Sequence, residues 1–322
     1  MTQPTEHRLQ PDSHTTLDLQ LTLASQLTVA ARVAAPQTRD EALQPLISQW
    51  RPRADFSAFA AYDAGATDGL NTKGYFGAVT DGRYIYFCPV RDQQDRGSVH
   101  GRVLRYDTHG AFKDPQSWAA HDASYTDGIH SAGFYGGACD GRYVYFNPRD
   151  DGRTHHSRLL RYDTRGDFKD PQSWAAHDVD FPHSGQGLAF DGRWLYFCPG
   201  YTTAPDYNPD DPGASLDNEP SGQMLRYDTA APLKDPASYQ VFDATRLSPR
   251  ATCFDGALYD GRHIYYAPLS GGLVLRYATD CDYADPTSWQ TFDATPMGMK
   301  MNVGLIFDGR HIYFCAYGNS HM

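Results

Sequence analysis

Short runs of alternating apolar and polar residues, each ended by a turn signal, follow one another from residue 54 to the end of the chain. Residues 74–123 show the pattern in full, with the runs GYFGAVTD, RYIYFCPV, RVLRYDT and SWAAHDA. Each run has the length and the period of a strand. Asp81-Gly82 is a dipeptide that closes tight hairpins, and Asp114-Pro115 breaks the chain before the fourth run. The segment is predicted to form one four-stranded antiparallel sheet, as in a propeller blade.

The tripeptide Asp-Gly-Arg begins the second run of each copy, at intervals of about 50 residues. An insertion at residues 201–222 lengthens the third interval. A glycine lies four residues before each tripeptide, which suits inner strands that crowd around one axis. The tripeptides begin at Asp81, Asp140, Asp191, Asp260 and Asp308. The glycines, called marker glycines below, are Gly77, Gly136, Gly187, Gly256 and Gly304.

The first and second strands of the repeat occur in five copies. The third and fourth strands follow them in only four of these copies. The missing fourth strand matches residues 54–65, where Phe59 takes the recurring Trp position, and LDLQLTL at residues 17–23 alternates like a further strand. The last blade is therefore expected to combine strands from both termini, which removes an exposed sheet edge. The prediction is an all-β, five-bladed β-propeller over residues 15–322, preceded by a disordered tail at 1–14.

The chain resembles bacterial proteins that carry tandem DGRYVYF, LRYDT and DPxSW repeats. The resemblance covers residues 54–322 and implies a β-propeller. It implies no particular activity.

Charge and composition narrow the classes of partner. The formal net charge is −11, which disfavours nucleic acid and anionic membranes as partners, since both need a basic surface. The N-terminus has no apolar signal segment, and we expect a cytoplasmic monomer. Three cysteines at one repeat position are expected to be buried, reduced thiols: Cys88, Cys198 and Cys315.

Residues that recur in every copy are expected to build the fold. The arginine of each tripeptide is predicted to form an ion pair or a hydrogen bond inside its blade. His121 and His177 alternate with aromatic residues in other copies, which indicates packing. The aspartate that ends each fourth strand is predicted to cap a turn.

Chemistry is expected where the copies differ, in the loops that precede the marker glycines. Every copy offers a cation or an imidazole there, and convergence of these groups would focus positive potential on one site. The five candidates are Lys73, His130, His183, Arg250 and Lys300. Polar and aromatic neighbours predicted to bind substrate are Asn71, Gln186, Asn302, Tyr75, Tyr135 and Asp255.

These residue types favour an enzyme acting on a small anionic or sugar-like substrate in an axial cup. His130 and His183 would act as general acid and base, while the Lys and Arg side chains would bind an anion and stabilise developing negative charge. Such a site suits a lyase, an isomerase or a hydrolase. The motifs of nucleotide-dependent and serine-hydrolase chemistry are absent from the sequence.

Three alternatives stay open at this stage. A divalent metal, zinc or calcium, could be held by His130, His183 and Cys253, or by the acidic insertion, although the ligand spacing is irregular. A two-carboxylate glycosidase would need a second acid beside Asp255. A glycan- or protein-binding module would use the same face without catalysis.

Overall fold

The structure is a computed structural model that describes residues 60–317, apart from 93–97, 182, 212–213 and 218; of His183 it describes the backbone alone. The tail at 1–14, the strand predicted at 17–23 and Phe59 therefore lie outside the described residues.

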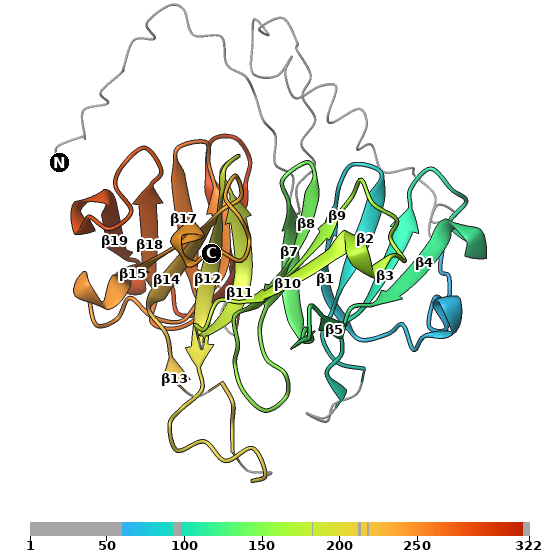
Figure 1. Ribbon diagram of the computed structural model, residues 1–322. Coiled ribbons are helices and arrows are strands. Elements are labelled where there is room, and N and C mark those ends of the chain that lie inside the picture. Colours follow the sequence, from blue (N-terminus) through green and yellow to red (C-terminus); the bar gives the residue numbers. More distant parts are fainter. Residues whose placement is uncertain (1–59, 93–97, 182, 212–213, 218, 318–322) are drawn as a thin grey trace, which may run out of the picture. The chain divides into compact units, whose positions relative to one another are not determined.

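Nearly all regular structure in the described residues is antiparallel strand, and four sheets of four consecutive strands follow one another along the chain (Figure 1). The third sheet also carries the short strand β13, and a fifth sheet has two strands. The first sheet has β1 (Tyr75–Thr80), β2 (Tyr84–Pro89), β3 (Arg102–Asp107) and β4 (Trp118–Asp122). The second has β7 (Phe134–Cys139), β8 (Tyr143–Pro148), β9 (Arg158–Asp163) and β10 (Trp174–Asp178). The third has β11 (His183–Phe190), β12 (Trp194–Thr202), β13 (Glu219–Pro220), β14 (Gln223–Asp228) and β15 (Tyr239–Asp243). The fourth has β16 (Phe254–Tyr259), β17 (His263–Pro268), β18 (Leu273–Ala278) and β19 (Trp289–Asp293), and the fifth has β20 (Asn302–Phe307) and β21 (Ile312–Ala316).

The remaining elements are short. A separate hairpin joins β5 (Tyr125–Thr126) to β6 (Ile129–His130). In each of the four-stranded sheets an Asp-Pro pair opens a 3₁₀ turn before the fourth strand, and the Asp side chain caps it. These turns are η4 (Pro115–Ser117), η5 (Pro171–Ser173), η6 (Pro236–Ser238) and η8 (Pro286–Ser288). The others are η2 (Thr67–Gly69), η7 (Ala244–Arg246) and η9 (Thr295–Met297). No helix of the described part is long and apolar enough to cross a membrane.

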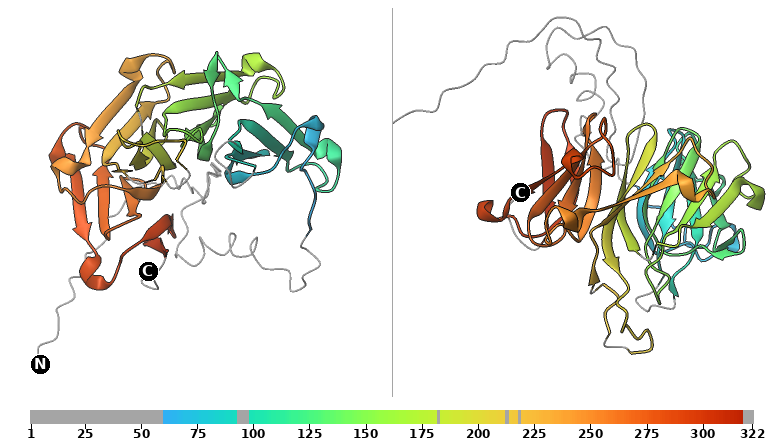
Figure 2. Two further views of the ribbon diagram at one scale, coloured as in Figure 1. Left: turned by 90° about the horizontal axis from the view of Figure 1, so that it is seen from below. Right: turned by 60° about the vertical axis from the view of Figure 1, so that its left-hand side comes forward.

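The first strands of successive sheets are neighbours in chain order, from β1 through β7, β11 and β16 to β20. Figure 2 shows the sheets side by side, with these strands on the inner side. The core consists of aromatic and aliphatic clusters between adjacent sheets, each drawing residues from two of them. A propeller-like all-β fold, as predicted, follows from this arrangement.

The marker glycines lie in β-bulges that recur at the same register. Gly256 has a φ of +98°, and its bulge falls between the Phe254–Pro268 and Ala257–Tyr266 pairs. A Cβ on Gly256 would lie 2.7 Å from the Cα of Gly304. The glycine is thus required twice, for a left-handed backbone and for the close approach of neighbouring strands.

The repeated tripeptide is a structural device, as its recurrence predicts. The Asp81 carboxylate accepts hydrogen bonds from the backbone N–H groups of Arg83 and Tyr84 and from the hydroxyl of Tyr86. Arg83 pairs with Asp107 of β3 at 2.7 Å. The same ion pair recurs in the next two sheets, as Arg142–Asp163 and Arg193–Asp228.

The residue before the fourth-strand aspartate stacks on the Trp position of the next sheet. His121 lies 4.7 Å from Trp174, and Phe242 lies 4.5 Å from Trp289, with ring planes within 10° of parallel. Burial lowers the pKa of His121, which favours the neutral imidazole. The prediction that this histidine is a packing residue is confirmed.

The prediction for the cysteines needs one correction. Cys88 and Cys198 are buried and free, as expected, but Cys315 is exposed. It lies on β21, which has no further strand beside it among the described residues.

Candidate functional site

The residue immediately before a marker glycine contacts its counterpart on another first strand in three of the five sheets. The hydroxyl of Tyr135 on β7 donates a hydrogen bond to Asp255 Oδ2 on β16 at 3.2 Å. Strand β11 lies between these two strands, so the bond links sheets that are not neighbours. Phe76 of the first sheet also stacks on Tyr135, so side chains at this position of the first, second and fourth sheets meet one another. We call the following group the axial cluster: Phe76, Tyr135, Gln186 and Asp255.

Asp255 is the titratable centre of this cluster. Its residue is 7% exposed, and burial raises the pKa of its carboxyl to about 6, although the Tyr135 hydroxyl and the Arg149 charge oppose the shift. A carboxyl with this pKa can both give up and take a proton near neutrality. Such groups are common in active sites and uncommon elsewhere.

Tyr135 is held on both faces. Phe76 stacks on its ring at 4.0 Å, and the guanidinium carbon of Arg149 lies 5.2 Å from the ring centroid. Burial and the nearby Asp255 charge raise the pKa of the Tyr135 phenol, so this hydroxyl stays protonated and remains a donor. Phe76 keeps 47% of its surface exposed, which leaves an aromatic wall open beside the Asp255 carboxyl.

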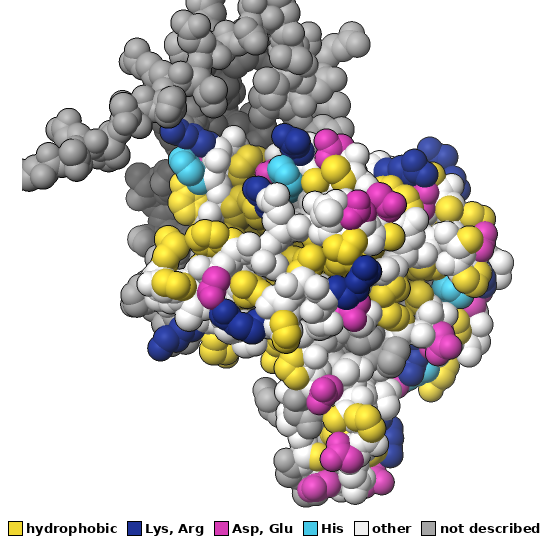
Figure 3. Space-filling view, turned by 90° about the vertical axis from the view of Figure 1, so that its left-hand side faces the viewer, with side chains coloured by type: hydrophobic (Ala, Val, Ile, Leu, Met, Phe, Trp, Pro, Cys, Tyr) yellow, Lys and Arg dark blue, Asp and Glu magenta, His cyan; other side chains and the backbone are white. Residues whose placement is uncertain are grey.

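Arg149 connects the cluster to the insertion at 201–222. Its Nη2 lies 2.7 Å from Asp217 Oδ2, and the other oxygen of Asp217 lies 3.2 Å from His155 Nε2. Burial alone would raise the pKa of Asp217, but hydrogen bonds from His155 and Arg149 and their charges bring it below its usual value. Asp217 therefore stays ionised and fixes Arg149. Figure 3 shows acidic side chains on the insertion, the part that projects at the bottom of the view.

Cys253 and Tyr201 form a second polar contact near this face. The thiol is buried, its pKa is raised by that burial, and the Tyr201 hydroxyl lies within hydrogen-bonding reach. Across the described residues, no three His, Cys, Asp or Glu side chains come together as metal ligands. The predicted metal set of His130, His183 and Cys253 therefore gains no geometric support, and the side chain of His183 is not among the described atoms.

Arg250 does not join the axial cluster. Its guanidinium binds Asp293 at 2.6 Å, the carbonyl of Gly271 at 2.6 Å and the hydroxyl of Thr295 at 2.9 Å. Asp293 ends β19, the outer strand of the fourth sheet. The expected anion-binding role is thus replaced by a structural ion pair.

His130 also lies away from the cluster. It belongs to the β5–β6 hairpin, which contacts the outer strand β10, and its ring packs on Tyr125 at 5.1 Å. Its carbonyl accepts a hydrogen bond from Arg158. The predicted acid–base role for His130 is therefore not supported by its position, and His183 is described only as the residue opposite Thr202 in β12.

Backbone hydrogen bonds show why these two predictions fail. The carbonyls of Gly74, Gly133 and Cys253 each accept a bond from the residue after the second strand, so the three positions are equivalent. Counted from them, Lys73 corresponds to Ala132, not to His130. His130 and Arg250 each lie six residues before their marker glycine, two residues farther along the chain than Lys73 and Lys300 are from theirs.

The other predicted residues have mixed positions. Lys73 and Lys300 are exposed, and neither forms a salt bridge with a described residue. The side-chain amide of Asn71 donates a hydrogen bond to Asp92 Oδ2 at 2.6 Å, so it is already engaged within the chain. Tyr75 has a buried hydroxyl without a partner in the described part, and neither polar atom of the fully buried Asn302 amide has one.

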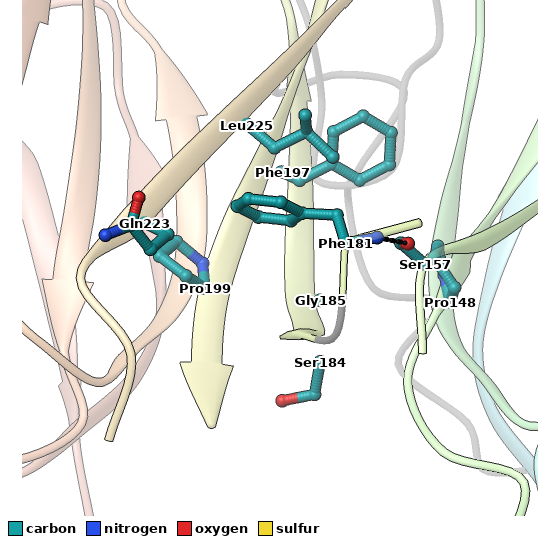
Figure 4. A pocket seen from close by; sticks show the side chains of 9 residues that line it. All are labelled: Pro148, Ser157, Phe181, Ser184, Gly185, Phe197, Pro199, Gln223 and Leu225. Atoms are coloured by element: carbon teal, nitrogen blue, oxygen red, sulfur yellow. Dashed lines mark hydrogen bonds between the residues drawn. The ribbon is translucent and has the colours of Figure 1, made fainter. Parts of the chain in front are cut away.

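Gln186 and a small hollow both lie at the third sheet. Gln186 is 3% exposed and lies against Gly200 of β12, where a larger residue would displace it. The hollow in Figure 4 lies between the second and third sheets, where the Phe181 N–H donates to Ser157 Oγ at 2.8 Å. Its volume is about 20 Å³, which suits a water molecule and not a substrate.

Comparison with known proteins identifies no family for the chain. No family model matches the chain, and no curated protein matches its sequence. Among solved structures, it is similar to the extracellular domain of a hybrid two-component system from B. thetaiotaomicron, at 10% identity and a TM-score of 0.45. The match covers 76% of this chain and 26% of that chain.

Proposed function

We propose that the axial cluster binds a small polar molecule, sugar-like or anionic, and that Asp255 exchanges a proton with it as general acid and base. The Tyr135–Asp255 hydrogen bond carries the proposal, because it joins two sheets through the centre of the fold. Phe76 supplies an open aromatic wall, and Gln186 and Arg149 supply an amide and a fixed cation. An aromatic wall with a few placed polar groups is the usual composition of a small-ligand site.

The proton-transfer step follows from this arrangement. Protonated Asp255 would donate to an oxygen of the bound molecule, and the resulting carboxylate would be stabilised by the Tyr135 hydroxyl and by Arg149. The reverse transfer restores the starting state. Lyases, isomerases and hydrolases all use such a step, and the proposed class is an enzyme of this kind.

The open face of Phe76 favours a second candidate, a glycan-binding module without catalysis. Stacking and hydrogen bonding alone would suffice for such binding. The two candidates differ in what Asp255 does. An enzyme needs its proton, whereas a binding module needs only its hydrogen bond.

The test is a thermal-shift screen of the full chain with neutral sugars, sugar acids and hydroxy acids, at pH 5 and pH 8. A true ligand should bind about tenfold more weakly to Tyr135→Phe, which loses the donor beside Asp255. Tyr265→Phe is the control, because the Tyr265 hydroxyl contacts Arg276 on β18 and lies outside the axial cluster. Equal affinities for the native chain and Tyr135→Phe would refute the site.

Turnover then separates the two candidates. With an enzyme, Asp255→Asn should lower kcat by a factor of about 100 or more and leave the affinity within a few-fold. With a binding module, no bound molecule is converted by the native chain at either pH.

We also propose that the fold is a five-bladed propeller closed by strands from both termini. Tyr62 stacks on Trp118 at 5.2 Å, which is the contact that each fourth strand makes with the next sheet. Phe292 holds the corresponding position at the other end of the series and is 59% exposed. Its partner in a closed ring would be Phe59.

A double-mutant cycle tests this closure. Phe59→Ala and Phe292→Ala, alone and together, are expected to show a coupling energy of about 1 kcal/mol in urea unfolding, as stacked aromatic pairs do. The control cycle combines Phe59→Ala with Val241→Ala, a change at another exposed side chain, and should show no coupling energy. Independent effects of Phe59→Ala and Phe292→Ala would argue against the closed ring.

A further inference from the structure

The arginine of the repeated Leu-Arg-Tyr motif is clamped between aromatic rings. The guanidinium carbon of Arg105 lies 4.2 Å from the ring centroid of Tyr84 and 4.2 Å from that of Phe168. Tyr84 belongs to the same sheet, and Phe168 comes from the next one. The contact therefore holds neighbouring sheets together through a cation–π sandwich.

Arg226 is clamped in the same way two interfaces further on, between the third and fourth sheets. It lies 4.0 Å from Trp194 and 4.1 Å from Tyr283, and its edge donates to Gln240 Oε1 at 2.6 and 2.9 Å. The guanidinium edge of Arg276, in the fourth sheet, likewise donates hydrogen bonds to Gln290 Oε1. The Arg226 site is thus complete, with a ring on each face and an acceptor at the edge, whereas Arg105 has Ala119 opposite it on β4.

Arg161, between the second and third sheets, has an incomplete site. It lies 4.1 Å over the ring of Tyr143, but Leu233 takes the place of the second ring. Its cross-strand neighbour is Ala175, where Arg226 has a glutamine. Arg161 still reaches the hydroxyl of Tyr227. It lacks both the second ring and the amide acceptor, a combination not found at Arg105, Arg226 or Arg276.

A hollow of about 570 Å³ lies at this place. Its wall includes the following side chains: Arg142, Tyr143, Arg161, Ala175, Leu233 and Lys234. Arg142 is neutralised by Asp163 at 2.7 Å, and Lys234 by Asp127 at 2.9 Å. Arg161 forms no ion pair with a described residue, so its positive charge remains in the wall of the hollow.

We infer that this hollow binds a small planar aromatic carboxylate. The ring of the ligand would stack on the face of Arg161 that Leu233 leaves open, and its carboxylate would accept hydrogen bonds from the guanidinium edge. The ligand would supply the second ring and the acceptor that the Arg226 interface contains within the chain. This site is separate from the axial cluster and does not depend on the function proposed for it.

The test is calorimetric titration of the full chain with 2-naphthoate at low salt. We expect one site per chain. Arg161→Lys keeps the charge but loses the planar stacking surface, and should weaken binding about tenfold. Leu233→Phe restores the ring found at this position of the Arg105 and Arg226 interfaces and should abolish binding by covering the open face of Arg161.

Matched controls distinguish this site from other sources of binding. Arg105→Lys changes the equivalent residue at a closed interface and should leave the affinity unchanged. Cyclohexanecarboxylate, which has the charge without the aromatic ring, should bind at least about fivefold more weakly. The inference is overturned if 2-naphthoate does not bind, if Arg161→Lys and Arg105→Lys behave alike, or if Asp255→Asn removes the binding.

Discussion

At pH 7.5 the Asp255→Asn variant is expected to be more stable than the native chain, by on the order of 2 kcal/mol. Burial holds the pKa of Asp255 at about 6 in the folded chain, against an ordinary value of 3.8. The native chain must therefore keep a poorly solvated carboxylate at neutral pH. Asparagine carries no charge and can still accept the hydrogen bond from Tyr135 through its amide oxygen.

The sign of the pH dependence follows from proton binding. Between pH 4 and pH 6 the folded chain binds a proton that the unfolded chain has released, so the Asp255 contribution to stability falls as pH rises. The loss is complete somewhat above pH 6. The stability difference between Asp255→Asn and the native chain should thus be small near pH 4 and largest above pH 7.

Urea unfolding at a series of pH values measures this difference directly. Asp228→Asn is a control of opposite sign, because a hydrogen bond from Arg193 lowers the pKa of Asp228 and the carboxylate is stabilising there. That variant should be less stable than the native chain at neutral pH. A difference for Asp255→Asn that does not change with pH would contradict the prediction.

A stabilising Asp255→Asn substitution would bear on function. Residues that lower stability and form part of a buried polar contact are commonly retained for binding or catalysis. Gln186 and Phe76 already provide polar and aromatic groups at neighbouring positions, so the fold does not need a carboxyl at this position. A measured stability gain would therefore support the proton-transfer role proposed for Asp255.

The sheets and their order could be predicted from the sequence because their signals are local. Strand alternation, the Asp-Gly turn and the Asp-Pro turn each act within a few residues. The marker glycines also placed Tyr135, Gln186 and Asp255 on the inner strands, since these residues lie inside the strands and no loop separates them from the glycine.

The loop residues could not be placed in the same way. Grouping residues four to six places before the glycine puts His130, at six, together with Lys73, at four, although the backbone register separates them. A shared Thr-Asp-Gly, at residues 67–69 and 126–128, was the available signal, because it aligns His130 with Asn71. Arg149 and Asp217 meet across 68 residues, and no local pattern encodes such a contact.

Gly256→Ala is expected to destabilise the chain by about 3 kcal/mol or more, which is the largest loss predicted here for a single added methyl group. Two costs combine at this position. The φ of +98° is unfavourable for alanine, and the new Cβ would lie 2.7 Å from the Cα of Gly304. The Cα of Gly304 belongs to the backbone of β20, so it cannot move aside without shifting that strand.

Gly136→Ala separates these two costs. Gly136 lies in the equivalent bulge with a φ of +81°, but a Cβ there would meet nothing within 4 Å. Its substitution should therefore cost only the backbone strain, about 1 kcal/mol. The difference between the unfolding free energies of the two variants gives the steric contribution. Equal losses of stability would show that the close approach of β20 is not the reason for glycine at position 256.

The Gly256→Ala variant should also disturb the axial cluster, because Asp255 precedes the glycine on the same bulge. Pushing β16 away from β20 would move the carboxyl relative to Tyr135, lengthen the 3.2 Å hydrogen bond and admit water. Greater solvation would lower the pKa of Asp255 towards its ordinary value and flatten the pH dependence between pH 4 and pH 7. Gly136→Ala tests the other partner, since Tyr135 precedes that glycine. If Gly256→Ala flattens the pH dependence while Gly136→Ala retains it, the close approach of the inner strands is what creates the unusual carboxyl.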